Sequence, residues 1–276
     1  MLSVNTNSGA MIALQYLNKT EGELQTTQTH INTGLKVSSA KDNGSTFAIA
    51  QNMRGNVSGY QAVSDSLNRG VSTVDVALSA GQSISDLMIE LKSKALAAAD
   101  SSLDTASRNA LDADFTALRD QITAIVQNAN FNGSNLVDGS VPSITALASA
   151  DGSRKITVAG VNMSLSSAII TITSTASIST QSKASSMIST INASLQNVNA
   201  ALARLAAGSK KFTIQNDFVG KLVDSLNAGI GNLVDADMAV ESARLQSLQV
   251  KQQLGVQALS IANAQPQIIL SLFRGG

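Results

Sequence analysis

Apolar residues along this chain recur at alternating steps of three and four, the heptad spacing of helices that pack along one another. The first segment starts at Ala10 and carries polar residues at two heptad positions, Glu21 and Gln28. The second segment, about 60–98, keeps the spacing throughout. Two more follow, at about 111–129 and 188–233. Repeats this long exceed what one globular helix needs and predict a mainly α protein, a long coiled-coil-like helical bundle.

Residues that cap helices divide this pattern. Asp104 or Thr105 is the predicted N-cap of the third helix, and Asp237 that of a final helix. Asn130–Gly133 is predicted to end the third helix, because Asn and Gly tolerate left-handed backbone. Pro266 is expected to kink or end the final helix.

The helical period disappears between about residues 135 and 182. Ser143–Ala148 and Lys155–Val158 flank Asp151-Gly152 and predict two short strands joined by a turn. The β-branched run 168–173 is a candidate further strand. The fold class therefore includes a small β-hairpin excursion between the N- and C-terminal helical halves.

The amino-acid composition argues against several classes of function. The 276 residues contain 19 Lys plus Arg, 19 Asp plus Glu, no Cys and one His, so no strong field attracts nucleic acid or an anionic membrane. Thiol chemistry is excluded, and we predict no catalytic, cofactor or metal site and no enzyme. His30 is interpreted as a solvated or interface residue. No stretch approaches the roughly 20 apolar residues of a membrane span, and the N-terminus lacks the pattern of a cleavable signal peptide.

Three fragments, in this order, make the chain resemble the bacterial flagellins. The N-terminal one contains Gly34, Ala40, Lys41 and Asp42, followed by 48–50; the second is Asn130–Gly133. The C-terminal one comprises 235–239, 252–255 and 265–274. The chain resembles a short form without extra surface domains. It departs from many relatives at Asn43, where a second acid is common, and at Thr33, where Ser is usual.

The resemblance implies a structural subunit that self-assembles into the bacterial flagellar filament for swimming motility. It implies three regions: an inner terminal coiled-coil layer of 1–34 plus 237–276, an outer helical rod of 42–136 plus 178–233, and a hairpin with a short variable surface segment at 137–177. The expected assembly interface is formed by apolar residues of both ends: Leu14, Leu17, Leu24, Ile31, Leu245, Leu248, Leu259 and Leu272.

The same resemblance implies partners and a location. We expect a homopolymer that meets flagellar cap and hook-associated proteins and an export chaperone, without nucleic acid or membrane partners. Type III export implies a secreted, extracellular protein of the bacterial flagellum, without cofactors. In flagellins recognised by Toll-like receptor 5, an arginine occupies the position of Glu90; Lys92, Ser93 and Lys94 stand nearby. A reversed charge at a recognition centre predicts weak receptor recognition.

Two alternatives and two interpretations stay open from the sequence. The alternatives are a flagellar hook–filament junction protein and a secreted helical binding or adhesion module that uses 137–177. Polar residues at heptad positions are interpreted as setting register: Glu21, Gln28, Ser209, Asn216 and Gln252. Residues about 143–158 are the candidate element that switches between two filament states.

Overall fold

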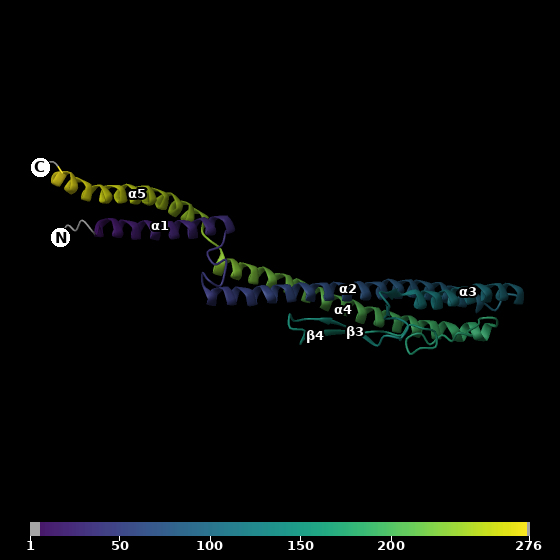
Figure 1. Ribbon diagram of the computed structural model, residues 1–276. Helices are drawn as coiled ribbons and strands as arrows, with labels where there is room; N and C mark the ends of the chain where they lie inside the picture. Colours follow the sequence, from purple (N-terminus) through teal and green to yellow (C-terminus); the bar gives the residue numbers. More distant parts are fainter. Residues whose placement is uncertain (1–5, 275–276) are drawn as a thin grey trace. The chain divides into compact units, whose positions relative to one another are not determined.

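The computed structural model describes residues 6–274, with side chains described as far as residue 264. These residues are mainly helical (Figure 1). The helices are α1 (Ser8–Thr33), α2 (Gly44–Ala98), α3 (Thr105–Asn128), α4 (Gln181–Val234) and α5 (Met238–Arg274). The strands are β1 (Asn130–Phe131), β2 (Ser134–Asn135), β3 (Ser143–Leu147) and β4 (Lys155–Ala159). The predicted fold class, mainly α with a small hairpin excursion, is confirmed.

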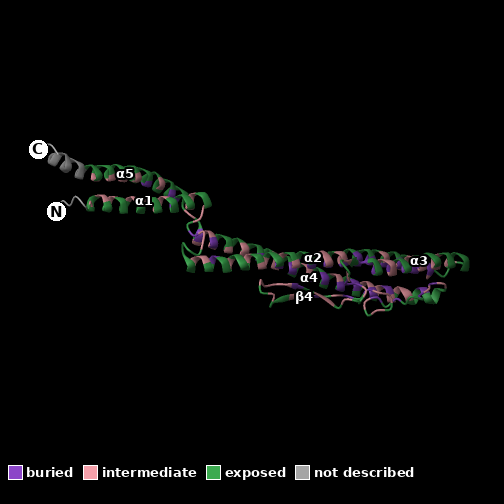
Figure 2. Ribbon diagram, in the orientation of Figure 1, coloured by how far each residue is buried: buried purple, intermediate pink, exposed green. Residues whose placement is uncertain are grey.

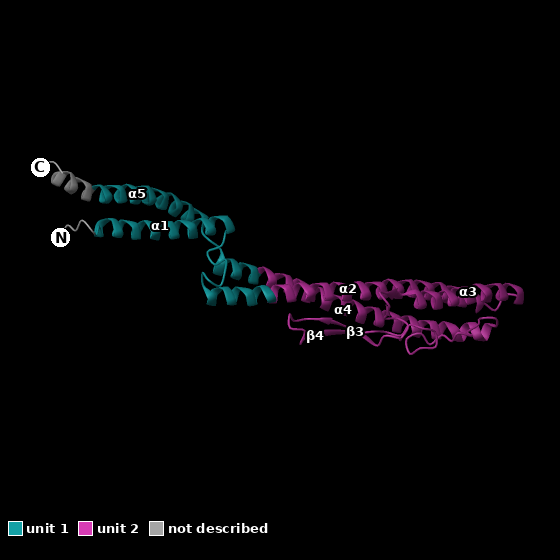
Figure 3. Ribbon diagram, in the orientation of Figure 1, with its two compact units in different colours: residues 1–55, 225–276 teal, residues 56–224 magenta. Residues whose placement is uncertain are grey.

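The chain forms two compact units (Figure 3). The first, which we call the terminal unit, combines residues Met1–Gly55 with Ser225–Gly276, so it holds α1, α5 and the adjoining ends of α2 and α4. The second, the central unit, is Asn56–Asp224 and holds the rest of α2 and α4 together with α3 and all four strands.

Helix ends lie where the capping residues predict them. The Oδ1 atom of Asp104 accepts a hydrogen bond from the Ser107 amide at 3.1 Å, and that of Asp237 accepts one from the Ala239 amide at 3.0 Å. These bonds satisfy amides that have no partner within the helix. Pro266 does not end α5, which continues to Arg274. Proline removes one backbone donor, but the helix continues past it.

The chain after α3 turns back at two residues with left-handed backbone. Asn132 has φ of 49° and Gly133 has φ of 81°, and together they connect β1 to β2. The Gly133 amide donates to the Oδ1 atom of Asn130 at 2.8 Å. Two consecutive positive φ values suit the tight turn of a two-residue hairpin, so the predicted end of this helix is confirmed.

The heptad faces of α2 and α4 form the core of the central unit, marked as buried in Figure 2. Positions of α2 at heptad spacing are buried from Val63 to Ala98, and they are matched by Ile191, Val198, Leu205, Phe212 and Val219 of α4. The largest fully buried side chains include Leu67, Ile84, Met88, Leu91, Phe115, Ile122 and Phe212. The heptad pattern therefore predicted this core correctly.

The buried face of α3 includes the predicted Phe115 and Ile122, but it passes through Arg119 and Val126 at the places predicted for Leu118 and Ile125. Leu118 and Ile125 are half-buried, whereas Arg119 and Val126 are buried. The Arg119 guanidinium reaches the carbonyl oxygen of Ala176 at 2.7 Å and bonds Asp120 on its other side. A buried arginine is tolerated because its donors are paired. A pattern of apolar residues cannot predict this buried position, because a polar residue occupies it.

The predicted hairpin of β3 and β4 is confirmed, with antiparallel pairing from Ser143–Ala159 to Leu147–Lys155. It is anchored to both long helices: the Leu147 amide donates to the Ser66 hydroxyl of α2, and the Gln215 side chain of α4 donates to the Ala148 carbonyl. Gly208 lets Val158 approach α4, because an added Cβ would lie 2.5 Å from a Val158 methyl group.

The prediction of a further strand at 168–173 is wrong. This segment contains no strand, only an isolated bridge between Leu165 and Ile170. Ile170 and Ile172 are buried in the central core, and the Thr171 amide donates to the Ser194 hydroxyl of α4 at 3.0 Å. The alternation of buried and exposed residues is therefore real, but the backbone is held by a helix side chain rather than by a neighbouring strand.

Candidate interaction surface

Helices α1 and α5 of the terminal unit lie side by side and run antiparallel (Figure 1). Near the chain ends, the Asn7 side-chain amide donates to the Ala262 carbonyl at 2.7 Å. At the opposite end of the pair, the Nδ1 atom of His30 lies 3.0 Å from the Oε1 atom of Glu241. The facing sides of these helices, between the two contacts, are called here the α1–α5 seam.

The α1–α5 seam buries few side chains completely. Among the described residues of these two helices, Thr27, Glu241 and Leu248 are buried, and two of these three are polar. Leu17 packs over Gly255, where an added Cβ would lie 3.3 Å from the Leu17 side chain. Such a pair has little apolar surface of its own to offset the entropy of ordering two long helices.

The expected interface residues divide into three groups. Leu248 is buried, and the half-buried ones are Leu17, Leu24, Ile31, Leu245 and Leu259. Leu14 is 47% exposed. Leu272 lies outside the residues whose side chains are described. Most of the expected residues are thus at least half covered within the chain, and among those with described side chains only Leu14 is exposed.

Ten large apolar residues of the same helices are exposed, and all of them except Leu14 lie outside the expected interface. We call them the exposed apolar set; it comprises Met11, Ile12, Leu14 and Tyr16 of α1, and Met238, Val240, Val250, Leu254, Val256 and Ile261 of α5. Tyr16 is 67% exposed and Ile261 is 66% exposed. Exposed apolar side chains in this number on one helix pair are typical of surfaces that bind other molecules. On α1, their signal in the sequence was apolar residues, apart from Leu14, that stand between the heptad positions.

The segment after α1 is tied to the segment before α5. Gly34 ends α1 with a φ of 71°, a conformation that favours glycine, and its amide donates to the His30 carbonyl at 2.8 Å. The Gly34 carbonyl accepts from the Ala236 amide at 2.9 Å, and the Lys36 amide donates to the Val234 carbonyl at 2.8 Å. Gly34 of the N-terminal motif therefore positions the connection to α2.

Asp42 organises the rest of this connection. One oxygen, Oδ2, accepts from the amides and the hydroxyls of both Ser38 and Ser39, at 2.9–3.2 Å. The bonds from Ser39 and Ser38 favour the charged form and lower the pKa of Asp42 below its usual value. Asn43 then caps α2 by accepting a hydrogen bond from the Thr46 amide at 3.0 Å. Asparagine at this position therefore caps the helix as an acidic residue would. Ala40 and Lys41 are exposed in the turn.

The polar heptad residues have different surroundings. Asn216 of α4 binds two residues of α2: it accepts from the Ser64 hydroxyl at 2.7 Å and donates to Asn68 at 2.9 Å. Ser209 donates to Asp75 of α2 at 3.2 Å. Glu21 and Gln28 are exposed, and the α1–α5 seam passes through the buried Thr27. A register role for these two residues between copies stays a prediction. Gln252 is half-buried.

The expected receptor positions lie on α2 of the central unit. Glu90 and Ser93 are exposed, and Lys92 and Lys94 are half-buried. The Lys94 ammonium pairs with Asp114 of α3 at 2.5 Å. Ile89 and Leu96, also exposed, flank these residues. Glu90 therefore presents an acidic group on an accessible part of this helix.

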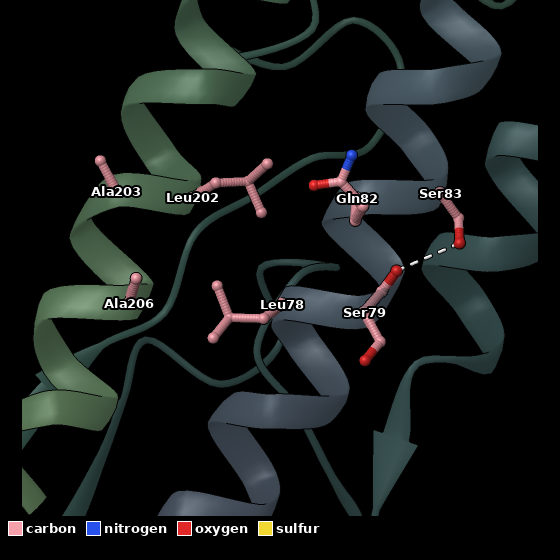
Figure 4. Close-up of a pocket in the computed structure, with 7 residues that line it drawn as sticks. All are labelled: Leu78, Ser79, Gln82, Ser83, Leu202, Ala203 and Ala206. Atoms are coloured by element: carbon pink, nitrogen blue, oxygen red, sulfur yellow. Dashed lines mark hydrogen bonds between the residues drawn. The ribbon is translucent and has the colours of Figure 1, made fainter.

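The central unit has an open groove of about 690 Å³ between α2 and α4. Figure 4 shows Leu78 and Leu202 directed toward each other across it, beside Gln82, with the Ser83 hydroxyl bonded to the Ser79 carbonyl at 3.1 Å. No titratable side chain lines this groove. Within the described residues, no group of three or more His, Asp or Glu side chains is placed to hold a metal, and no helix is long and apolar enough to cross a membrane.

Comparison with known proteins finds a family-model match for each half of the chain. Residues 4–141 match the model of the bacterial flagellin N-terminal helical region, and residues 188–273 match that of the C-terminal helical region. Flagellin FljK of Caulobacter vibrioides is 55% identical over 272 residues, which cover 99% of this chain and 98% of that protein. A flagellin of Brucella melitensis is 38% identical over 284 residues and covers both chains completely.

A solved structure has a similar fold. It is a Vibrio parahaemolyticus protein named "putative flagellar hook-associated protein", with a TM-score of 0.60 and 11% identity. The match covers 70% of this chain and 100% of that chain. At this identity the likeness concerns the arrangement of helices alone.

Proposed function

Since the chain belongs to the bacterial flagellin family and is a subunit of the flagellar filament, we propose that α1 and α5 are the elements through which copies join. The exposed apolar set is the observation that carries this proposal. A helix pair with three buried residues among those described, and with ten large apolar side chains exposed, gains most of its stability by contact with further copies.

Folding and assembly are coupled in this proposal. The α1–α5 seam is too thinly packed to hold the pair firmly, so the ends of the free subunit are largely unfolded and order when neighbouring copies cover them. Residues 1–34 and 237–276 then form the inner layer, and 42–136 with 178–233 the outer rod. Residues 137–177 form the surface segment, in which the hairpin at 143–158 is the switching element.

The remaining partners follow from the same role. The subunit polymerises with other flagellin subunits, and we extend its contacts to an export chaperone and to the cap and hook-associated proteins at the filament ends. The protein is exported and acts outside the cell, as a structural protein rather than an enzyme. The full-length match to filament flagellins favours this role over a junction protein or an adhesion module.

Recognition by Toll-like receptor 5 is proposed to be weak. Glu90 places a negative charge where recognised flagellins carry an arginine, and it is exposed on α2. A like-charge contact or an unpaired carboxylate in a recognition interface costs several kcal/mol. Endotoxin-free protein is expected to give a much lower response than a recognised flagellin in a receptor-reporter cell line, and an equal response would contradict this.

Seeded growth tests the filament role directly. Purified full chain is incubated with short filament fragments and observed by negative-stain electron microscopy. We expect long, thin filaments to grow from the fragment ends, because the seeds present a partner surface for the exposed apolar set. A control flagellin extends its own seeds under the same conditions. A chain that stays monomeric where the control grows would favour the junction or adhesion roles.

A further inference from the structure

The single histidine and a buried glutamate meet at one end of the α1–α5 seam. The Nδ1 atom of His30 lies 3.0 Å from the Oε1 atom of Glu241, and the two side chains are 14% and 11% exposed. An ionised carboxylate only accepts hydrogen bonds, so the histidine tautomer that fits this contact carries its proton on Nδ1. The other ring nitrogen, Nε2, then remains free to take a second proton.

Glu241 has an unsatisfied acceptor at this site. Its second oxygen, Oε2, is buried and has no hydrogen-bond partner within the described part of the chain. A buried carboxylate with one neutral donor is poorly compensated, because burial removes the water that would otherwise bind it. A positive charge on His30 would compensate the carboxylate through the existing contact without moving either helix.

The positions of both residues in their helices favour the charged pair. His30 lies in the last turn of α1, where the helix carries partial negative charge. Glu241 lies in the first turn of α5, where the helix carries partial positive charge. Protonation of His30 therefore creates a cation opposite the Glu241 anion. Each charge suits its own helix end, and the two face each other in a poorly solvated contact.

Other charged groups around this junction are engaged elsewhere or exposed. The Lys36 ammonium donates to the Asn232 carbonyl at 3.0 Å, and the Asp237 carboxylate caps α5. Asp235 precedes it and is exposed, as is Arg244, one turn beyond Glu241. Glu23 stands two turns before His30 on α1 and is half-buried. Among described residues, only Glu241 forms an ion pair with His30.

We propose that His30 and Glu241 form a proton-sensitive latch that tightens the α1–α5 pair at mildly acidic pH and so favours assembly. This inference rests on the proposed assembly role of α1 and α5. The direction follows from the contact: a proton added to His30 places a cation 3.0 Å from a buried carboxylate with an unpaired oxygen, so acid strengthens the contact and base weakens it.

The critical concentration for seeded growth of the full chain, measured at pH 6.0 and pH 8.0, tests the latch. We expect wild type to require about three- to tenfold less protein at pH 6.0, a range typical of a charge at a helix end in a partly buried site. His30→Gln keeps a neutral donor that does not titrate, and Glu241→Gln removes the buried charge. Both variants are expected to lose this pH difference, and Glu241→Gln to grow at pH 8.0 as well as at pH 6.0.

Asp114→Asn is the matched control, because it removes the exposed carboxylate that pairs with Lys94 and lies far in sequence from His30. It is expected to keep the wild-type pH difference. A pH difference that persists in His30→Gln or in Glu241→Gln would overturn the latch, as would growth of wild type that is equal at both pH values. Variants that fail to grow at either pH would show a fixed structural contact and also overturn it. These outcomes leave the assembly role intact, since wild type still forms filaments.

Discussion

Removal of residues 1–30 or of residues 245–276 is expected to abolish filament formation and to leave the central unit folded. Either deletion removes most of one helix of the terminal unit, while the fully buried side chains of the central core lie between Val63 and Val219. The core loses no packing partner, because the helices that bury it are α2, α3 and α4. Negative-stain microscopy after seeding and sedimentation measure the first effect, and circular dichroism melting measures the second.

We expect filament formation to be lost completely, because several apolar contacts disappear together. Fully burying one large apolar side chain contributes about 1.5–3 kcal/mol, and each 1.4 kcal/mol changes an equilibrium constant about tenfold. The 1–30 deletion removes Met11, Ile12, Leu14 and Tyr16 at once, and also the partner against which α5 packs. The full-length chain, seeded in parallel, is the control. Normal filaments from either shortened chain would contradict the assembly role of the terminal helices.

The sequence predicted the parts of the molecule whose structure depends on local spacing. The heptad positions of α2 and α4 are buried because a helix of this length places every third or fourth residue on one face. The caps at Asp104 and Asp237, and the turn at Asn132-Gly133, depend on neighbouring residues alone. The hairpin of β3 and β4 was also predictable, because the two short strand segments and the turn between them lie within one short stretch of the chain.

The parts that were missed depend on residues far apart in the chain. On α1, apolar residues stand on several faces, so spacing could not show that Thr27 rather than Gln28 lies on the seam. Arg119 is buried because the Ala176 carbonyl, 57 residues away, accepts a hydrogen bond from its guanidinium group. His30 meets Glu241 across 211 residues, and no local pattern connects them. The sequence thus predicted the terminal helices themselves but not which of their side chains remain exposed.

Phe212→Ala is expected to destabilise the central unit strongly. The Phe212 ring is fully buried, and it packs against α2 where Gly70 has no side chain: an added Cβ there would lie 3.1 Å from the ring. Removing a buried aromatic ring leaves a cavity and costs about 3–5 kcal/mol of unfolding free energy. For a domain of this size, the melting temperature falls by roughly 6–20 °C. Thermal unfolding of the full chain, followed by circular dichroism, measures the change.

Phe218→Ala is the matched control, because the same side chain is removed from the same helix at a position that is 56% exposed. Truncation of an exposed side chain opens no cavity, so its unfolding free energy is expected to stay within about 0.5 kcal/mol of wild type. A similar loss in both variants would mean that the α2–α4 packing does not stabilise the unit. A large loss in Phe212→Ala alone would establish that the rod depends on this interface, where the glycine of one helix admits the aromatic ring of the other.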